Sequence, residues 1–205
     1  MDFDLKKDKQ TGAYYLDYYI KSSLQRHFPE EELEFTKRLY KYKDYTGHSD
    51  RDVWADFTVE LMKGVTRIAD EAPLRFNEIH MVAVPGSHPE KYSPMADSIK
   101  MIAKLSKDGA AGCKRPLIDK SDLIIRTTPI LPAHKRAYYG QRRPDIPEHM
   151  QTMSLTSDVH TSGVLYMIMD DIVSSGNSLW ACANVLMVAG VPENNFRFIA
   201  IGRTL

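Results

Sequence analysis

The stretch that decides the fold is GVLYMIMDDIVSSGNS, residues 163–178. Six apolar residues follow Gly163 and end at Met169, and the adjacent acids Asp170 and Asp171 come directly after them. A short unbroken apolar run is typical of a strand that is buried on both faces of a parallel sheet. We therefore expect a strand that ends at Met169, with two carboxylates at its carboxyl end.

Apolar runs and helical spacing elsewhere in the chain predict the fold class. Further apolar runs predict strands over residues 79–86, 122–126 and 196–202. Apolar side chains at helical spacing predict helices over residues 51–69, 94–105 and 178–190. Strands that alternate with helices predict an α/β fold, in which a mostly parallel central sheet is flanked by helices on both faces.

The first part of the chain predicts a helical segment in front of this domain. In residues 13–24, tyrosines and aliphatic residues are spaced as on one face of a helix. The acids of PEEELEF, residues 29–35, favour a helix start because they complement the helix dipole. We expect an N-terminal helical segment over residues 1–35 and the main domain over residues 36–205. The tyrosines fit a packed helix or a dimer contact better than a ligand-stacking role.

Composition restricts the class of protein. The 205 residues include 27 Lys plus Arg and 27 Asp plus Glu, so the overall charge does not favour a nucleic-acid or membrane-surface protein. The two cysteines, Cys113 and Cys182, lie far apart and predict neither a disulfide framework nor a CxxC zinc site. The first residues lack a signal-peptide pattern, and no apolar run has the length of a membrane span. These features favour a cytoplasmic protein.

The residues after the acid pair form a candidate anion site. Gly176 allows a tight turn and a close backbone approach, and residues 174–178 open the next predicted helix. Backbone N–H groups at a helix start attract anions, and the serine hydroxyls add further donors. The two carboxylates can accept hydrogen bonds from vicinal hydroxyls, as an acid does with ribose in dinucleotide folds. The combination predicts a ribose 5-phosphate site, and the simpler alternative is a solvated acid pair before a capped helix.

Residues 166–178, YMIMDDIVSSGNS, resemble the motif with which type I phosphoribosyltransferases bind phosphoribosyl pyrophosphate (PRPP). The shared pattern is four apolar residues, two acids, two apolar residues and a loop of small residues, with serines where threonines are more usual. The resemblance implies that Asp170 and Asp171 hold the ribose hydroxyls at the catalytic centre. It also implies a cradle for the 5-phosphate made by Ile172, Val173, Ser174, Ser175, Gly176, Asn177 and Ser178.

Two further segments fit the same resemblance. In VAVPGSHP, residues 82–89, it implies pyrophosphate contacts from Pro85, Gly86, Ser87 and His88, although an ordinary strand-to-helix turn fits equally well. Residues 127–150 are rich in proline and predict a long irregular stretch. The family closes a flexible basic loop over PRPP from this part of the chain, which implies that role for Lys135, Arg136, Arg142 and Arg143. A solvated loop or a nucleic-acid patch is the alternative.

The order of elements over residues 38–204 is most similar to the ComF branch of the family. ComF proteins often begin with a four-cysteine zinc ribbon, and here a tyrosine-rich segment stands instead. The resemblance implies transfer of a 5-phosphoribosyl group from PRPP to a nitrogen acceptor, with Mg²⁺ held mainly by PRPP oxygens and water. It also implies a homodimer. A non-catalytic PRPP- or nucleotide-sensing regulator is the main alternative, a nucleic-acid binder is a third, and the acceptor is not identified.

Overall fold

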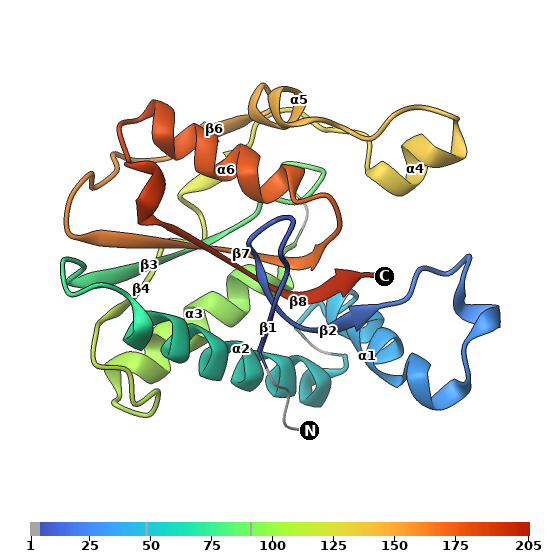
Figure 1. The fold of residues 1–205 in the computed structure, drawn as a ribbon, viewed down its shortest axis with the longest axis horizontal. Helices are drawn as coiled ribbons and strands as arrows, with labels where there is room; N and C mark the ends of the chain where they lie inside the picture. The colour runs from blue at the N-terminus through green and yellow to red at the C-terminus, as the bar shows by residue number, and fades with distance from the viewer. Residues whose placement is uncertain (1–4, 48, 91) are drawn as a thin grey trace.

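A six-stranded sheet forms the centre of the protein in a computed structural model that describes residues 5–47, 49–90 and 92–205. Its strand order is β1-β2-β8-β7-β3-β4, and every neighbouring pair is parallel except β1 with β2 (Figure 1). The predicted mostly parallel central sheet is therefore confirmed. The strands are β1 (Lys6–Lys7), β2 (Tyr14–Tyr19), β3 (Glu78–Ala83), β4 (Leu117–Asp119), β7 (Val164–Val173) and β8 (Phe196–Thr204).

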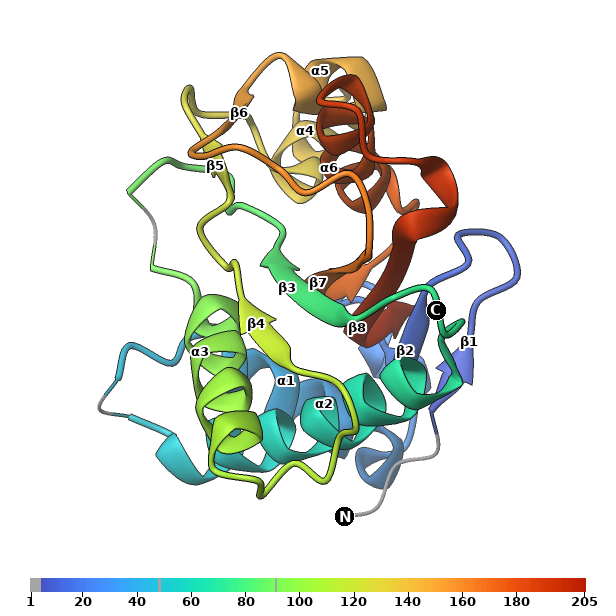
Figure 2. The same cartoon turned by 90° about the vertical axis from the view of Figure 1, so that its left-hand side faces the viewer.

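Helices cover both faces of this sheet, as the sequence predicts. One face carries α1 (Glu34–Lys43), α2 (Arg51–Glu71) and α3 (Pro94–Lys107), and α6 (Asn177–Val188) covers the other (Figures 1 and 2). The helices predicted over residues 51–69, 94–105 and 178–190 correspond to α2, α3 and α6. Within the described ranges, no helix combines the length and the apolar character needed to cross a membrane.

Strand β7 shows why the central strands are apolar on both faces. Met167 and Met169 pack in the core beneath α1, α2 and α3, whereas Tyr166 and Ile168 pack in the core beneath α6. Successive side chains of a strand point to opposite faces, so each face of β7 contributes to a different core. Complete burial of a large apolar side chain contributes about 1.5–3 kcal/mol, and this packing fixes the end of β7 where the acids lie.

The N-terminal segment is not the predicted helix. Residues 14–19 form β2, which runs parallel to β8 with Tyr15 opposite Ala200. Tyrosine favours strands, and Leu16 packs in the core beneath α1 while Ala13 packs beneath α6. The described residues between β2 and α1 form only short 3₁₀ helices, at Gln25–His27 and Glu30–Leu33. The predicted boundary at residue 35 falls inside α1, and residues 1–4 lie outside the described residues.

A small second layer lies on the α6 side of the sheet. There β5 (Ile124–Arg126) pairs antiparallel with β6 (Met153–Leu155), separate from the central sheet (Figure 2). The place beside β3 is taken by β4, which the sequence analysis did not predict. The prediction of an irregular stretch over residues 127–150 is partly wrong, because it contains α4 (Ala133–Tyr138) and α5 (Ile146–Met150). A capping box between Asp145 and Glu148 starts α5.

Candidate functional site

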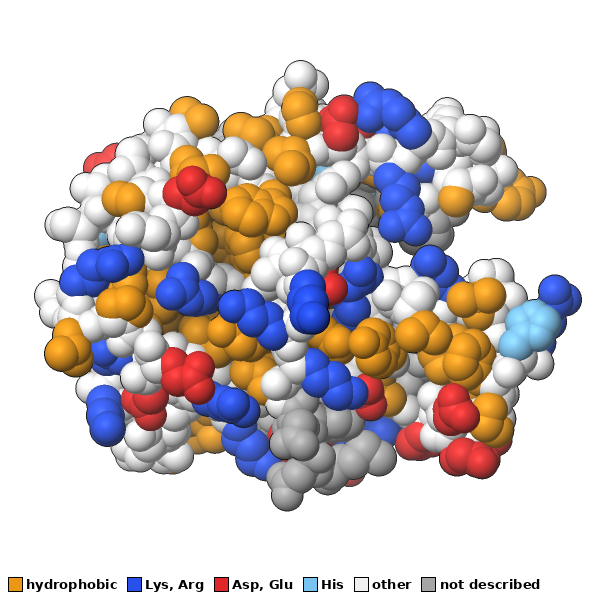
Figure 3. All heavy atoms as spheres, in the orientation of Figure 1, with side chains coloured by type: hydrophobic (Ala, Val, Ile, Leu, Met, Phe, Trp, Pro, Cys, Tyr) orange, Lys and Arg blue, Asp and Glu red, His pale blue; other side chains and the backbone are white. Residues whose placement is uncertain are grey.

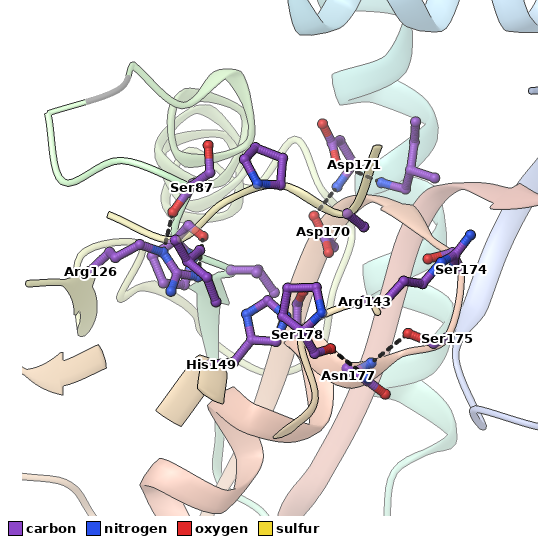
Figure 4. A pocket seen from close by; sticks show the side chains of 18 of the residues that line it. Ser87, Arg126, Arg143, His149, Asp170, Asp171, Ser174, Ser175, Asn177 and Ser178 are labelled. Atoms are coloured by element: carbon purple, nitrogen blue, oxygen red, sulfur yellow. Dashed lines mark hydrogen bonds between the residues drawn. The ribbon is translucent and has the colours of Figure 1, made fainter. Parts of the chain in front are cut away.

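A cavity of about 290 Å³ opens at the carboxyl end of the parallel strands. Its wall comes from the loop after β3, the segment between β5 and β6, and the end of β7 with the start of α6 (Figure 4). Ligands of open α/β sheets bind in this position. The fold therefore brings three predicted segments together, and the predicted residues that line the cavity are Pro85, Gly86, Ser87, Arg143, Asp170, Asp171, Ile172, Ser174, Ser175, Asn177 and Ser178.

The acid pair lies inside strand β7 and not after it, which corrects the predicted strand end at Met169. Strand β8 continues to Thr204, and this partner keeps β7 in register, with Asp170 opposite Ala200 and Ile172 opposite Gly202. The sheet ladder therefore fixes the backbone of both acids. Their carboxylates project from a rigid edge, which suits a site that must hold a ligand in one orientation.

The two acids have different environments. Asp170 Oδ1 accepts a hydrogen bond from the Asp171 N–H at 2.8 Å, and Asp171 Oδ2 lies 3.0 Å from Lys43 Nζ. Burial, aided by the charge of Asp171, raises the pKa of Asp170 well above its usual range. Burial also opposes ionisation of Asp171, but the Lys43 ammonium outweighs it and lowers the pKa of Asp171. Asp171 is therefore the anion of the pair, and Asp170 keeps its proton to a higher pH.

Lys43 is a site residue that the sequence analysis missed. It is the last residue of α1 and lines the cavity beside the acid pair. Its neighbour Tyr42 is buried and shares a 3.0 Å hydrogen bond with Ser98 Oγ, which anchors this end of α1 to α3. The charge of Asp171 raises the pKa of Lys43. Its role depends on tertiary packing, and no local pattern around it in the sequence indicates the contact.

The loop after β7 presents free backbone donors at the start of α6. Within the described part of the chain, the N–H groups of Ser174, Ser175 and Gly176 donate to no protein acceptor. The N-cap residue Gly176 has no side chain to cap α6, although Ser175 Oγ accepts a long hydrogen bond from the Asn177 N–H at 3.5 Å. A second cavity of about 30 Å³ lies inside the loop and has room for a water-sized group such as a phosphate oxygen. Uncapped N–H groups around such a space form an anion site.

Gly176 forms the tight turn before α6 that the sequence predicts. Its φ is +78°, in the left-handed region that favours glycine. A Cβ at this position would lie 2.8 Å from Thr11 Cγ2 and 3.2 Å from Thr11 Cβ, in the turn between β1 and β2. The absent side chain therefore makes room for Thr11. Neither Gly176 nor Val173, a core residue beneath α6, lines the main cavity, but both line the 30 Å³ cavity in the loop.

The loop after β3 lies at the cavity, and Arg126 holds its shape. Pro85, Gly86 and Ser87 line the cavity, whereas His88 is exposed outside it. The Arg126 guanidinium is buried and donates to the carbonyl oxygens of Gly86 and Pro85, and also to the Thr152 hydroxyl. These hydrogen bonds show that Arg126 connects β5 to the loop after β3.

Only part of the predicted basic loop reaches the cavity. Arg143 lines it, but Arg136 pairs with Glu148 at 3.2 Å and Arg142 pairs with Asp145 at 2.8 Å, so neither lies in the lining. Lys135 is exposed on α4 and also lies outside the lining. The segment is joined to the loop after β7 by the Asn177 side chain, which donates to Pro144 O at 2.8 Å. Of the four basic residues predicted for this segment, only Arg143 lies in the lining.

His149 is a second lining residue that the sequence analysis missed. It lies on α5 and is buried, and Nδ1 has no hydrogen-bond partner among the described residues. Burial, together with the nearby Arg126 charge, lowers the pKa of His149 to about 4. The imidazole is therefore neutral at physiological pH and adds no charge to the cavity.

The donor set of the site does not suit a cation held by the protein alone. No group of three or more His, Cys, Asp or Glu residues in the described ranges is arranged to hold a metal ion. Asp171 already pairs with Lys43. A hard divalent cation prefers six or more oxygen ligands, so most of them would have to come from a bound ligand and from water.

Comparison with known proteins adds no assignment. No protein-family model matches the chain, and no curated protein matches its sequence. The chemistry of the cavity is therefore inferred from its own residues and their geometry.

Proposed function

We propose that the protein transfers the 5-phosphoribosyl group of PRPP to a nitrogen acceptor and releases pyrophosphate. The supporting observation is that one cavity combines an acid pair, a loop with free N–H groups at a helix start and the loop after β3. In this assignment, the N–H groups of residues 174–176 bind the 5-phosphate and Asp170 and Asp171 bind the ribose hydroxyls. The loop at Pro85–Ser87 then faces the pyrophosphate.

The charges in the cavity suit an anionic sugar phosphate. Lys43 and Arg143 contribute positive charge to the lining, and Asp171 is the ionised acid of the pair. Asp170 retains its proton to a higher pH, which reduces the repulsion between the acid pair and a phosphate.

The reaction breaks the bond between ribose C1 and the pyrophosphate oxygen, and it forms a bond from C1 to the acceptor nitrogen. Positive charge develops on the ribose and negative charge on the leaving pyrophosphate, and the acceptor loses a proton to solvent. The carboxylate of Asp171 lies where it can stabilise the first charge, and Lys43 and Arg143 can stabilise the second. A divalent cation bound with PRPP would neutralise part of the pyrophosphate charge. The rigid end of β7 positions the sugar for this transfer.

Pyrophosphate release tests this proposal. The protein is mixed with PRPP, Mg²⁺ and a panel of nitrogen-containing bases and amines, and released pyrophosphate is measured. We expect release that depends on one class of acceptor. The Asp171→Asn variant loses a charged acceptor while it keeps the size of the side chain. Charge-assisted hydrogen bonds contribute about 1.5–3 kcal/mol, so its PRPP affinity should fall roughly ten- to a hundredfold.

The release assay, combined with a measurement of PRPP binding, distinguishes the enzyme from a regulator. A protein that binds PRPP but releases no pyrophosphate with any acceptor would be a non-catalytic PRPP-sensing regulator. An Asp171→Asn variant that binds PRPP normally but melts at a much lower temperature would show that the acid pair is structural.

A further inference from the structure

The cation Lys43 lies on a wall that two cavities share. A third cavity, of about 100 Å³, adjoins the main one and is bounded by Tyr42, Lys43, Val84, Pro85, Gly86, Tyr92, Ser93, Pro94, Met95, Asp170 and Asp171. Lys43, the first three residues of the loop after β3 and the acid pair line both spaces. The Lys43 side chain therefore borders the same two spaces as the acids and the loop that is assigned to pyrophosphate.

Lys43 also differs from the other cations of the main cavity. Arg126 is tied to backbone carbonyl oxygens of the loop after β3, and Arg143 has no ion-pair partner among the described residues. Lys43 pairs directly with one of the two acids, at 3.0 Å, although both side chains are about one-third exposed. An ion pair that is partly open to solvent contributes little to stability, so a stronger ligand can displace it at low cost.

Both oxygens of Asp171 already have a partner in the free protein. Its Oδ1 accepts the Ile172 N–H at 2.7 Å, and its Oδ2 carries the Lys43 ammonium. A ribose hydroxyl that donates to Oδ2 shares the negative charge of that oxygen with Lys43 and so weakens the ion pair. The pyrophosphate of PRPP offers several anionic oxygens on the other side of the lysine, beside Pro85 and Gly86, and these attract an ammonium more strongly than one carboxylate does.

We propose that Lys43 is an exchangeable positioning residue, which holds Asp171 in the free protein and moves to the pyrophosphate oxygens of PRPP when the ribose hydroxyl takes its place on Asp171. This inference rests on the proposed function and extends it to a residue of α1. The anchored end of α1 keeps the Lys43 backbone fixed, while the flexible side chain spans the two positions. Binding of the sugar and binding of the pyrophosphate are then coupled through one ammonium group.

Calorimetric titration with three ligands tests the exchange. The ligands are PRPP, inorganic pyrophosphate and ribose 5-phosphate, each in the presence of Mg²⁺. For Lys43→Met we expect affinities for PRPP and pyrophosphate to fall about ten- to a hundredfold, because a charge-assisted contact is lost. The affinity for ribose 5-phosphate should stay within about threefold of the wild-type value or increase, because Asp171 is freed. Lys43→Arg keeps the positive charge and should retain most of the pyrophosphate affinity.

Lys41→Met is the matched control. Lys41 lies in the same last turn of α1, is exposed and lines neither cavity, so all three affinities should match the wild type. If Lys43→Met does not fold, Lys43→Gln carries the same test because it keeps a polar contact to Asp171. Equal losses for all three ligands would overturn the exchange and leave Lys43 as a simple support for Asp171. Unchanged affinities would show that Lys43 does not reach the pyrophosphate.

Different results reject the phosphoribosyltransferase site and the exchange of Lys43. A wild-type protein that binds none of the three ligands rejects the phosphoribosyltransferase site itself, and the exchange with it. A wild-type protein that binds PRPP, with a Lys43→Met variant that shows no selective loss of pyrophosphate affinity, rejects the exchange alone.

Discussion

Replacing Gly176 with valine is expected to abolish detectable binding of PRPP and to lower the melting temperature. The left-handed backbone at φ +78° costs a non-glycine residue about 1–2 kcal/mol, and a β-branched side chain is the least tolerant of it. The new Cβ would also lie 2.8 Å from Thr11 Cγ2, so the loop or the β1–β2 turn would have to move. A shift of the loop misplaces the N–H groups of residues 174–176. Calorimetry with Mg²⁺ and PRPP, together with a thermal melt, measures both effects.

Gly109→Val is the control for backbone strain. Gly109 has φ +75° in the turn after α3, and an added Cβ there meets nothing within 4 Å. This variant should lose stability without losing PRPP affinity. A double variant, Gly176→Ala with Thr11→Ser, removes the nearest methyl group and should recover part of the binding that Gly176→Ala loses. Wild-type PRPP affinity in Gly176→Val would contradict the assignment of the phosphate to this loop.

Replacing Arg126 with methionine is expected to have the second large effect. The buried guanidinium donates to Pro85 O, Gly86 O and the Thr152 hydroxyl, and methionine leaves these groups without that donor. A hydrogen bond from a charged group contributes about 1.5–3 kcal/mol, and water can replace part of what is lost at the exposed Gly86, so we expect a loss of about 2–4 kcal/mol in the free energy of unfolding. The loop after β3 should also lose its shape, and the affinity for Mg²⁺-pyrophosphate should fall at least tenfold. Denaturant unfolding and calorimetry measure the two quantities.

Arg115 provides a matched comparison far from the cavity. Its guanidinium donates to the carbonyl oxygens of Phe76, Ala69 and Ala72, the same kind of role that Arg126 has. Arg115→Met should therefore reduce stability while it leaves pyrophosphate affinity unchanged. Equal pyrophosphate affinities in the two variants, measured at a temperature where both are folded, would show that the loop held by Arg126 does not contact pyrophosphate.

The central strands and the turn between β7 and α6 could be predicted from the sequence because their signals are local. An apolar run that ends in two acids fixes β7, and Gly176 marks the turn before α6. The predicted helix over residues 13–24 was wrong. The apolar residues of YYLDYY are spaced in a way that fits both the helix repeat and the strand repeat, and pairing with β8 favours the strand. The extension of β7 to Val173 likewise depends on its partner β8, which the local sequence does not show.

The residues that shape the cavity were harder to predict because their contacts join distant parts of the chain. Lys43 meets Asp171 only when α1 packs against the sheet, and Arg126 meets Gly86 only when β5 lies over the loop after β3. In both cases the residue type alone fits a solvated surface charge. Thr11 is similar, because it lies beside Gly176 only when the turn between β1 and β2 packs against the start of α6. Other Lys and Arg side chains are spread over the face shown in Figure 3, so the residue type alone does not distinguish a site residue from a surface charge.

The central claim is that this cavity binds PRPP as its Mg²⁺ complex. The most direct measurement is calorimetric titration of the wild-type protein with PRPP, with Mg²⁺ and then with the ion removed by a chelator. The site has cations for only part of the pyrophosphate charge, and no cluster of protein ligands for a metal in the described residues, so a divalent ion has to arrive with the ligand. We predict one site per chain with Mg²⁺ and an affinity at least tenfold weaker without it. Equal heats under both conditions, or no heat in either, would contradict the account.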